Sequence, residues 1–262
     1  MDEIRVAVVG RRAGYNLGMD AKSPSSHANR EFESTRWSLV IAAAQGETSH
    51  RHRALSELCE IYWSPIYSYA RRRGSASHDA QDLTQSFFVR LLEKDAIAAA
   101  DPERGRFRAF LLSSFRNFVA NEWDKATAKK RGGGQTALQL DFAQGERSYA
   151  RAQTDLTPEQ LFERQWAVAL LDLVMEKLRD EQVSSGKERQ FELLKVFLPG
   201  KSKDKNYREV AKDLEMTEAA TMSAASRLRR RYRELLMAEI SHTVADPADI
   251  DDEIRSLFRS LG

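Results

Sequence analysis

The feature that most constrains the fold is the return of apolar residues every three or four positions along most of the chain. The clearest case is the segment 107–131, FRAFLLSSFRNFVANEWDKATAKKR. Its apolar stripe consists of Phe107, Phe110, Leu111, Phe115, Phe118 and Val119. That spacing is typical of one face of a long helix. Only six prolines and thirteen glycines interrupt the 262 residues, so we expect an all-α protein built from long helices.

Composition indicates a charge-rich protein of no particular whole-chain polarity. The 41 basic and 39 acidic residues leave a net charge of +2, so only local clusters of charge can point to a partner. No apolar run reaches the roughly 20 residues that a membrane helix needs, and the first residues do not resemble a secretory signal. The single cysteine, Cys59, lies on an apolar helix face, which favours a buried structural thiol. We therefore expect a cytoplasmic protein that does not enter a membrane.

Changes in periodicity divide the sequence into segments. A glycine-led, polar and weakly periodic stretch separates two helical parts, and we interpret it as a flexible linker. A second polar stretch without periodicity opens the chain. The predicted organisation is a leader at 1–33, a first helical domain at 34–131, a linker at 132–155, a second helical domain at 156–241 and a C-terminal helical extension at 242–262.

Capping signals locate several helix starts. Thr157 and Gln160 have the spacing of a capping box, with Pro158 at the first helical position. Thr217 precedes another helical run and is expected to cap it. We therefore predict helices that begin at about residues 158 and 218.

The sequence offers no convincing catalytic or metal-binding constellation. His50 and His52 form an isolated pair with no third ligand at a useful spacing. Acidic pairs such as Asp79 and Asp82 fall in predicted first helical turns, where they complement the helix dipole. We predict a protein that is not an enzyme and that has no cofactor and no metal.

The polar face of the segment 107–131 and the loop before it are rich in groups that bind nucleic acids. Guanidinium and ammonium groups can contact phosphates, while amides and aromatic rings can contact exposed bases. The alternative is an ordinary core helix with a solvated basic face. The candidate nucleic-acid residues are Arg104, Arg106, Arg108, Arg116, Asn117, Trp123, Lys125, Lys129 and Lys130.

The segment 207–236 has the layout of a helix-turn-helix. Two helical runs flank a tight break, and the second run carries the basic sequence RLRRRYR at 227–233. Such arginines give affinity for duplex DNA more readily than choice of sequence. The candidate duplex-binding residues are Thr217, Ser223, Ser226, Arg227, Arg229, Arg230 and Arg231.

The ordered segments together resemble bacterial RNA polymerase sigma factors of the sigma-70 family, in the extracytoplasmic-function class. The segments YWSPIYSYARRRG and DAQDLTQSFFVRLL resemble the helix pair that binds the polymerase clamp helices. FRAFLLSSFRNFVANEW resembles the promoter-melting segment, with Arg116 and Asn117 on the family's Arg-Asn pair. YREVAKDLEMTEAATMSAASRLRRRYREL resembles the helix-turn-helix that reads the upstream promoter element. TRWSLV, FERQW and the C-terminal tail are also similar to a large subgroup common in planctomycetes.

The resemblance implies two helical domains, like sigma regions 2 and 4, and a role in transcription initiation. The partners it implies are core RNA polymerase, through its clamp helices and flap, promoter DNA, and an anti-sigma or other regulatory protein. The loop 94–106 would capture a base flipped from the melted strand, and the candidate residues of the segment 107–131 would face single-stranded promoter DNA. The polymerase-binding residues would be Asp82, Leu83, Gln85, Phe87, Phe88 and Arg90.

Two positions of the predicted recognition helix depart from the family pattern. Met222 and Ala224 occupy places in the recognition helix where the family often has basic residues. A second hypothesis is a helix-turn-helix regulator that binds duplex DNA without polymerase, and a third is a helical adaptor of the anti-sigma type. Only the sigma hypothesis requires the pattern that runs from Asp82 to Phe88.

Overall fold

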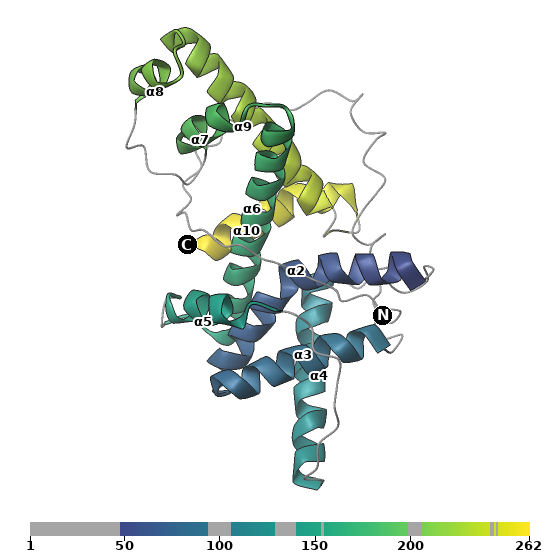
Figure 1. Cartoon of the computed structure of the whole chain (residues 1–262). Helices are drawn as coiled ribbons and strands as arrows, with labels where there is room; N and C mark the ends of the chain where they lie inside the picture. The colour runs from purple at the N-terminus through teal and green to yellow at the C-terminus, as the bar shows by residue number, and fades with distance from the viewer. Residues whose placement is uncertain are drawn as a thin grey trace. The chain divides into compact units, whose positions relative to one another are not determined.

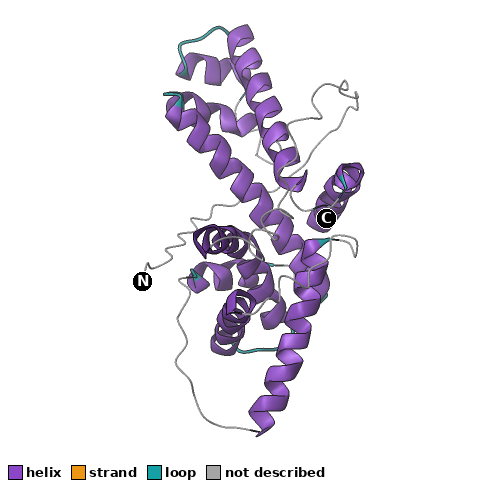
Figure 2. Cartoon of the chain, turned by 90° about the vertical axis from the view of Figure 1, so that its right-hand side faces the viewer, coloured by secondary structure: helices purple, strands orange, loops and turns teal. Residues whose placement is uncertain are grey.

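A computed structural model describes residues 48–93, 106–128, 140–152, 155–198, 206–241, 244 and 246–262. All regular structure within these ranges is helical, as Figure 2 shows, which confirms the predicted all-α class. The predicted leader at 1–33 and the run RWSLVIAAA lie outside the described residues.

Contacts between residues divide the chain into two compact units. The described part of unit 1 comes from residues up to Ala169 and from Ile240 onward, and that of unit 2 from Leu170–Glu239. The boundary falls within helix α6 (Pro158–Ser184), whereas the sequence led us to expect it in the segment 132–155.

Unit 1 is built around three helices, α2 (Thr48–Arg72), α3 (Ser77–Glu93) and α4 (Phe107–Ala128), which Figure 1 shows in purple to teal. Each contacts the other two. Buried aromatic side chains pack where these helices meet: Tyr62 of α2 meets Phe107 of α4, and Phe87 of α3 meets Phe115 of α4. α2 continues through Pro65. Cys59 is buried as predicted, and burial raises the pKa of its thiol to about 12, which leaves it unreactive.

A helix occupies part of the expected linker. Residues Phe142–Ala150 form α5, whose first turn is capped by Asp141 through a 3.0 Å bond from the Gln144 backbone N–H. The ring of Phe142 meets that of Trp63 edge to face, with centroids 5.6 Å apart. Gly145 is buried against the Trp63 ring, so this glycine allows close packing. The flexible-linker prediction therefore does not hold for 142–150.

A polar cluster also joins α5 to α2. Arg71 donates two hydrogen bonds to the Glu146 carboxylate, at 2.8 and 3.0 Å, and the Tyr67 hydroxyl donates a further bond to it. The bonds from Arg71 are the largest cause that lowers the pKa of Glu146. Glu146 is therefore charged at neutral pH, and it holds α5 in register on α2.

The predicted capping box at the start of α6 is confirmed. The Gln160 N–H donates to Thr157 Oγ1 at 3.2 Å, and the Thr157 N–H donates to Gln160 Oε1 at 2.9 Å. α6 carries an apolar stripe that is wholly buried, and its members are Leu161, Trp166, Leu170, Leu171, Val174 and Leu178.

The C-terminal extension contributes to unit 1. A short 3-10 helix, η4 (Pro247–Asp249), leads into α10 (Ile250–Leu261). Leu257 and the carboxylate of Glu253 are buried, so one face of α10 is covered. This agrees with the predicted C-terminal helix.

Unit 2 contains α7 (Glu188–Leu194), η3 (Lys195–Phe197), α8 (Tyr207–Asp213) and α9 (Glu218–Ser241), besides its share of α6. Asn206 and Glu209 form a capping box at the start of α8. The turn between α8 and α9 includes Glu215, whose φ is 55°. Thr217 caps α9 as predicted, because its hydroxyl accepts from the Ala220 N–H at 3.2 Å.

Candidate protein and nucleic-acid interface

The predicted polymerase-binding residues divide between the surface and the core of unit 1. Asp82 is exposed on α3, while Leu83 and Gln85 are partly exposed. Asp82 lies 3.2 Å from His78, one turn earlier, and both side chains are in solvent. These residues form an accessible flank of α3.

Phe87 and Phe88 are buried, which corrects the expectation that they contact a partner. The Phe87 ring packs edge to face on Phe115 of α4, with centroids 5.1 Å apart, and it also touches Phe88 and Phe118. Two large apolar side chains gain more from this core than from exposure. Their role is to hold α3 on α4.

Arg90 extends the flank of α3 toward α4. Its guanidinium lies over the Phe118 ring, 5.7 Å from the centroid, and 3.9 Å from Glu122. It is partly exposed, so a partner that contacts Gln85 can also contact Arg90.

On α4, the structure separates an apolar face from a polar one. Phe107, Leu111, Phe115 and Phe118 are buried, as the spacing predicts. Arg116 and Asn117 are exposed next to each other. Arg116 is 4.0 Å from Glu159, and both of those side chains are largely in solvent, so this pair holds Arg116 weakly.

Other candidates from the sequence cannot be placed. Arg104, Lys129 and Lys130 lie outside the described residues. Trp123 and Lys125 are helical residues of α4, but their side chains are outside the described set.

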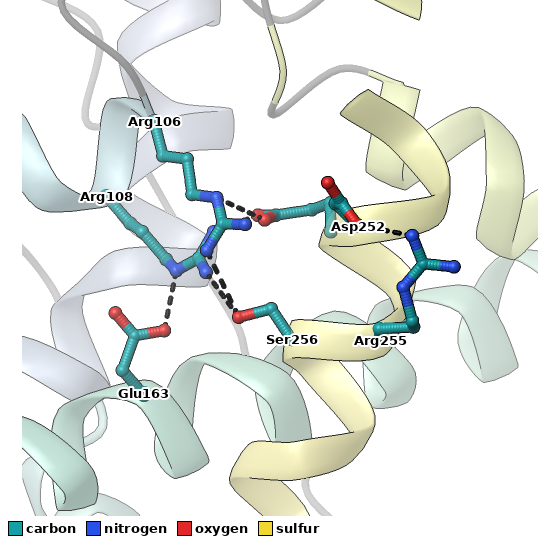
Figure 3. A network of polar contacts seen from close by, with 7 residues as sticks. Arg106, Arg108, Glu163, Asp252, Arg255 and Ser256 are labelled. Atoms are coloured by element: carbon teal, nitrogen blue, oxygen red, sulfur yellow. Dashed lines mark hydrogen bonds and ion pairs between the residues drawn. The ribbon is translucent and has the colours of Figure 1, made fainter. Parts of the chain in front are cut away.

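Arg108 does not face solvent, which corrects its assignment to a nucleic-acid surface. Its side chain is 2% exposed and donates to Glu163 at 2.6 Å and to the buried Glu253 of α10, as well as to Ser256. Figure 3 shows the bonds to Glu163 and Ser256. The guanidinium also lies 4.2 Å from the centroid of the Trp166 ring.

Helical spacing explains this placement. Arg108 lies three, four and seven residues before Leu111, Leu112 and Phe115, so it belongs to the edge of the buried stripe. Burial lowers the pKa of Arg108, and Glu163 opposes that change. A guanidinium nevertheless stays protonated in a protein, so Arg108 is a buried cation held by carboxylates.

Arg106 belongs to the same cluster but is nearer to solvent. Its side chain is 41% exposed, its Nε is 2.8 Å from Glu253 Oε2, and its Nη1 is 3.2 Å from Ser256 Oγ (Figure 3). Two arginines thus face two carboxylates, Glu163 and Glu253. The sequence predicted a helix in this C-terminal segment, but these carboxylates were missed as partners.

In unit 2, the burial pattern fixes which side of α9 faces outward. The buried side contains Thr221, Ala224, Ala225, Leu228 and Tyr232. The exposed side contains Met222, Ser223, Ser226, Arg227 and Arg230. Among the predicted duplex-binding residues, Thr217, Ser223, Ser226, Arg227, Arg230 and Arg231 are exposed, and Arg229 is partly exposed.

Two arginines of the predicted basic surface hold unit 2 together. Arg229 donates to the Tyr207 hydroxyl at 2.9 Å, which ties α9 to α8. Arg231 makes a two-point pair with Glu181, at 2.7 and 2.8 Å, and also contacts Glu234. These bonds raise the pKa of Arg231 and lower that of Glu181. Both arginines therefore have a structural partner that DNA would have to replace.

No group of three or more potential ligands that could hold a metal occurs in the described part of the chain. The side chains of His50 and His52 are outside that part. None of the helices that the structure describes has the length and apolarity needed to cross a bilayer.

Part of the chain matches a known protein family. Residues 58–129 match the family model for sigma-70 region 2, a segment that spans most of α2, α3 and α4. It includes the exposed flank of α3 and the Arg116–Asn117 pair. No curated protein and no solved structure matches the chain. The match supports a sigma factor of the sigma-70 family, a class of transcription initiation factors that are not enzymes.

Proposed function

We propose that this chain, which carries a segment matching sigma-70 region 2, is a promoter-specificity subunit of bacterial RNA polymerase. That match over residues 58–129 is the observation that carries the proposal. On the motifs quoted above, we assign it to the extracytoplasmic-function class and, within that class, to the large planctomycete-type subgroup. It would act in the cytoplasm, where polymerase and promoter DNA are found.

The exposed flank of α3 is proposed to bind the clamp helices of the core enzyme. It presents Asp82 with Leu83, Gln85 and Arg90 on one helix. A mixed surface of this kind, with an apolar residue among charged and amide groups, suits a specific protein contact. Phe87 and Phe88 support it from below, because they fix α3 against α4.

The exposed face of α4 is proposed to bind the melted strand. Arg116 supplies a positive charge for phosphate, and Asn117 supplies donor and acceptor groups for the edge of a base. Arg104, Trp123, Lys125, Lys129 and Lys130 remain in this proposal on the basis of sequence, and Arg106 on the basis of its partial exposure.

This function needs no covalent chemistry. Unstacking and flipping a base costs a few kcal/mol, and contacts with the extruded base and its phosphates offset that cost. Strand separation is then driven by binding energy alone.

Unit 2 is proposed to be the region 4-like helix-turn-helix that binds upstream duplex and the polymerase flap. The exposed side of α9 would enter the major groove. We propose that Arg227 and Arg230 contact phosphate and that Ser223 and Ser226 contact base edges, while Thr217, Arg229 and Arg231 maintain the motif. An anti-sigma protein would regulate access to either surface.

A pull-down of core polymerase by the full chain tests the central part of this proposal. We expect wild-type protein to retain the core enzyme and Asp82→Ala to weaken retention about tenfold, as for loss of a contact worth roughly 1.4 kcal/mol. Asp79→Ala is the matched control, because Asp79 is also an exposed acidic residue of α3, three residues earlier.

The control variant should bind like the wild type. Failure of the wild type to retain core polymerase would overturn the proposal and would favour a stand-alone regulator. Equal losses of core-polymerase retention for the two variants would contradict the assignment of the α3 flank to polymerase binding.

A further inference from the structure

An exposed methionine lies on the helix proposed to enter the major groove. Met222 is 49% exposed, and Val183 of α6, at 42%, is the other large apolar side chain exposed among the described residues. An isolated exposed apolar residue needs no explanation by itself. Met222, however, is the fifth residue of α9, near the N-terminal end of the helix. Helix-turn-helix motifs present this end of their second helix to base edges.

The neighbours of Met222 define a polar surface around it. Ser226 and Arg230 follow at four and eight residues, so they lie on the same side of α9, and Ser223 and Arg227 flank them. Ala224 is buried. Of the two positions that depart from the family pattern, only Met222 can therefore reach DNA.

The chemistry of the groove limits what Met222 can recognise. A thioether offers no useful hydrogen-bond donor and only a weak acceptor. The apolar group on the floor of the major groove is the C5-methyl of thymine, whereas the other base edges there present donors and acceptors. If Met222 lay over a base edge that presents donors and acceptors, it would displace water from these groups without replacing the hydrogen bonds that the water made.

We propose that Met222 is a specificity-determining residue that contacts a thymine methyl group in the upstream promoter duplex. The proposal rests on the proposed function of unit 2 as a duplex-binding motif, and it adds the base that one position of the element must contain. The serines can accommodate several bases, and the arginines contact phosphate, so Met222 is the residue on this surface that distinguishes thymine.

The test uses the full chain bound to core polymerase. Duplex sites are first selected from a randomised library, and each thymidine of the selected element is then replaced by deoxyuridine. This replacement removes one methyl group and leaves the hydrogen-bonding edge of the base unchanged. Binding is measured for the wild type, Met222→Ala and Val183→Ala on both sets of duplexes.

We expect one position at which deoxyuridine weakens binding by the wild type about fourfold, the effect of one buried methyl-sized group. Met222→Ala should bind the thymine and uracil duplexes equally well. Val183→Ala, which removes the other exposed apolar side chain, should keep the wild-type ratio. Since Met222 is exposed, its replacement should leave the fold intact, and circular dichroism checks this.

Two outcomes separate the inference from its premise. Selected binding with the same thymine-to-uracil ratio in wild type and Met222→Ala would overturn the role of Met222 and leave the proposed function standing. Failure of the wild-type complex to select any upstream sequence would overturn the proposed function of unit 2, and the inference with it.

Discussion

A buried arginine is costly unless carboxylates surround it, and Arg108 has two such partners. Its pairs with Glu163 and with the fully buried Glu253 connect α4, α6 and α10 within unit 1. The desolvation of such groups makes removal of one partner more damaging than loss of an exposed pair. The cluster therefore attaches the C-terminal helix to the region 2-like unit.

Glu253→Ala should destabilise unit 1 by about 3 kcal/mol, because it removes the carboxylate that pairs with Arg106 and leaves the buried Arg108 with the partly exposed Glu163 as its carboxylate partner. Thermal unfolding followed by circular dichroism measures the effect. Asp252→Ala is the control: Asp252 pairs with Arg255 on the exposed side of α10, and its removal should leave the melting temperature unchanged. Equal shifts for both variants would show that the buried cluster does not anchor α10.

For single residues, the sequence predicts which side chains are buried better than it predicts which residues they contact. The phenylalanines of α4 repeat at helical spacing, and their burial could be predicted. Arg108 lies at the edge of the same stripe, but a charge next to an apolar stripe is usually solvated, and only the tertiary fold brings Glu163 and Glu253 to it. Phe87 was assigned to a partner because it falls on a family motif. Such a motif does not distinguish a residue that contacts the partner from a core residue that supports the contacting surface.

At the scale of elements, α5 shows how a glycine can be misread. Glycine, glutamine and arginine in a short run are typical of linkers, and the segment 132–155 is weakly periodic. The Asp141 cap and the Phe142 contact with Trp63 nevertheless stabilise a helix, since packing supplies what intrinsic propensity does not. The capping boxes of α6 and α8 gave stronger local signals, and the first of these was predicted.

Gly145→Ala should release α5 from α2. A methyl group at this position would lie 2.8 Å from Trp63 Cζ3, and the Trp63 ring is buried and cannot move aside easily. Alanine has a helix propensity about 1 kcal/mol more favourable than that of glycine. A loss of stability in this variant would therefore have to come from the clash with Trp63. Amide hydrogen exchange should show reduced protection in α5 and in the adjoining part of α2.

Arg147→Ala is the matched control, because Arg147 is an exposed residue of the same helix. It should keep the wild-type protection of α5. Increased protection in Gly145→Ala would mean that Gly145 is not required for close packing, and that α5 gains more from helix propensity than it loses at Trp63.

At the scale of the whole molecule, sequence periodicity was sufficient for the all-α class, while the division into units required tertiary contacts. The chain passes from unit 1 to unit 2 within the continuous periodic pattern of α6, which carries no glycine or proline signal at Ala169. The assignment of the α10 segment to unit 1 also depends on contacts between residues far apart in the sequence. Neither could be derived from local patterns.

Unit 1 contains the segment that matches sigma-70 region 2, so it links the fold to the proposed function. Two separate functions are proposed for its surfaces: polymerase binding for the α3 flank, and binding of the melted strand for the polar face of α4. A substitution on α4 should therefore impair melting while leaving assembly with polymerase intact.

The most direct measurement is promoter-specific run-off transcription by core polymerase with the full chain, with permanganate footprinting of the melted strand. The account predicts transcripts from defined start sites with the wild type. It also predicts about a tenfold loss of open complex for Asn117→Ala, equivalent to roughly 1.4 kcal/mol, with unchanged binding to core enzyme. Absence of specific transcripts with the wild type, under conditions where the core enzyme is active, would contradict the assignment as a sigma factor.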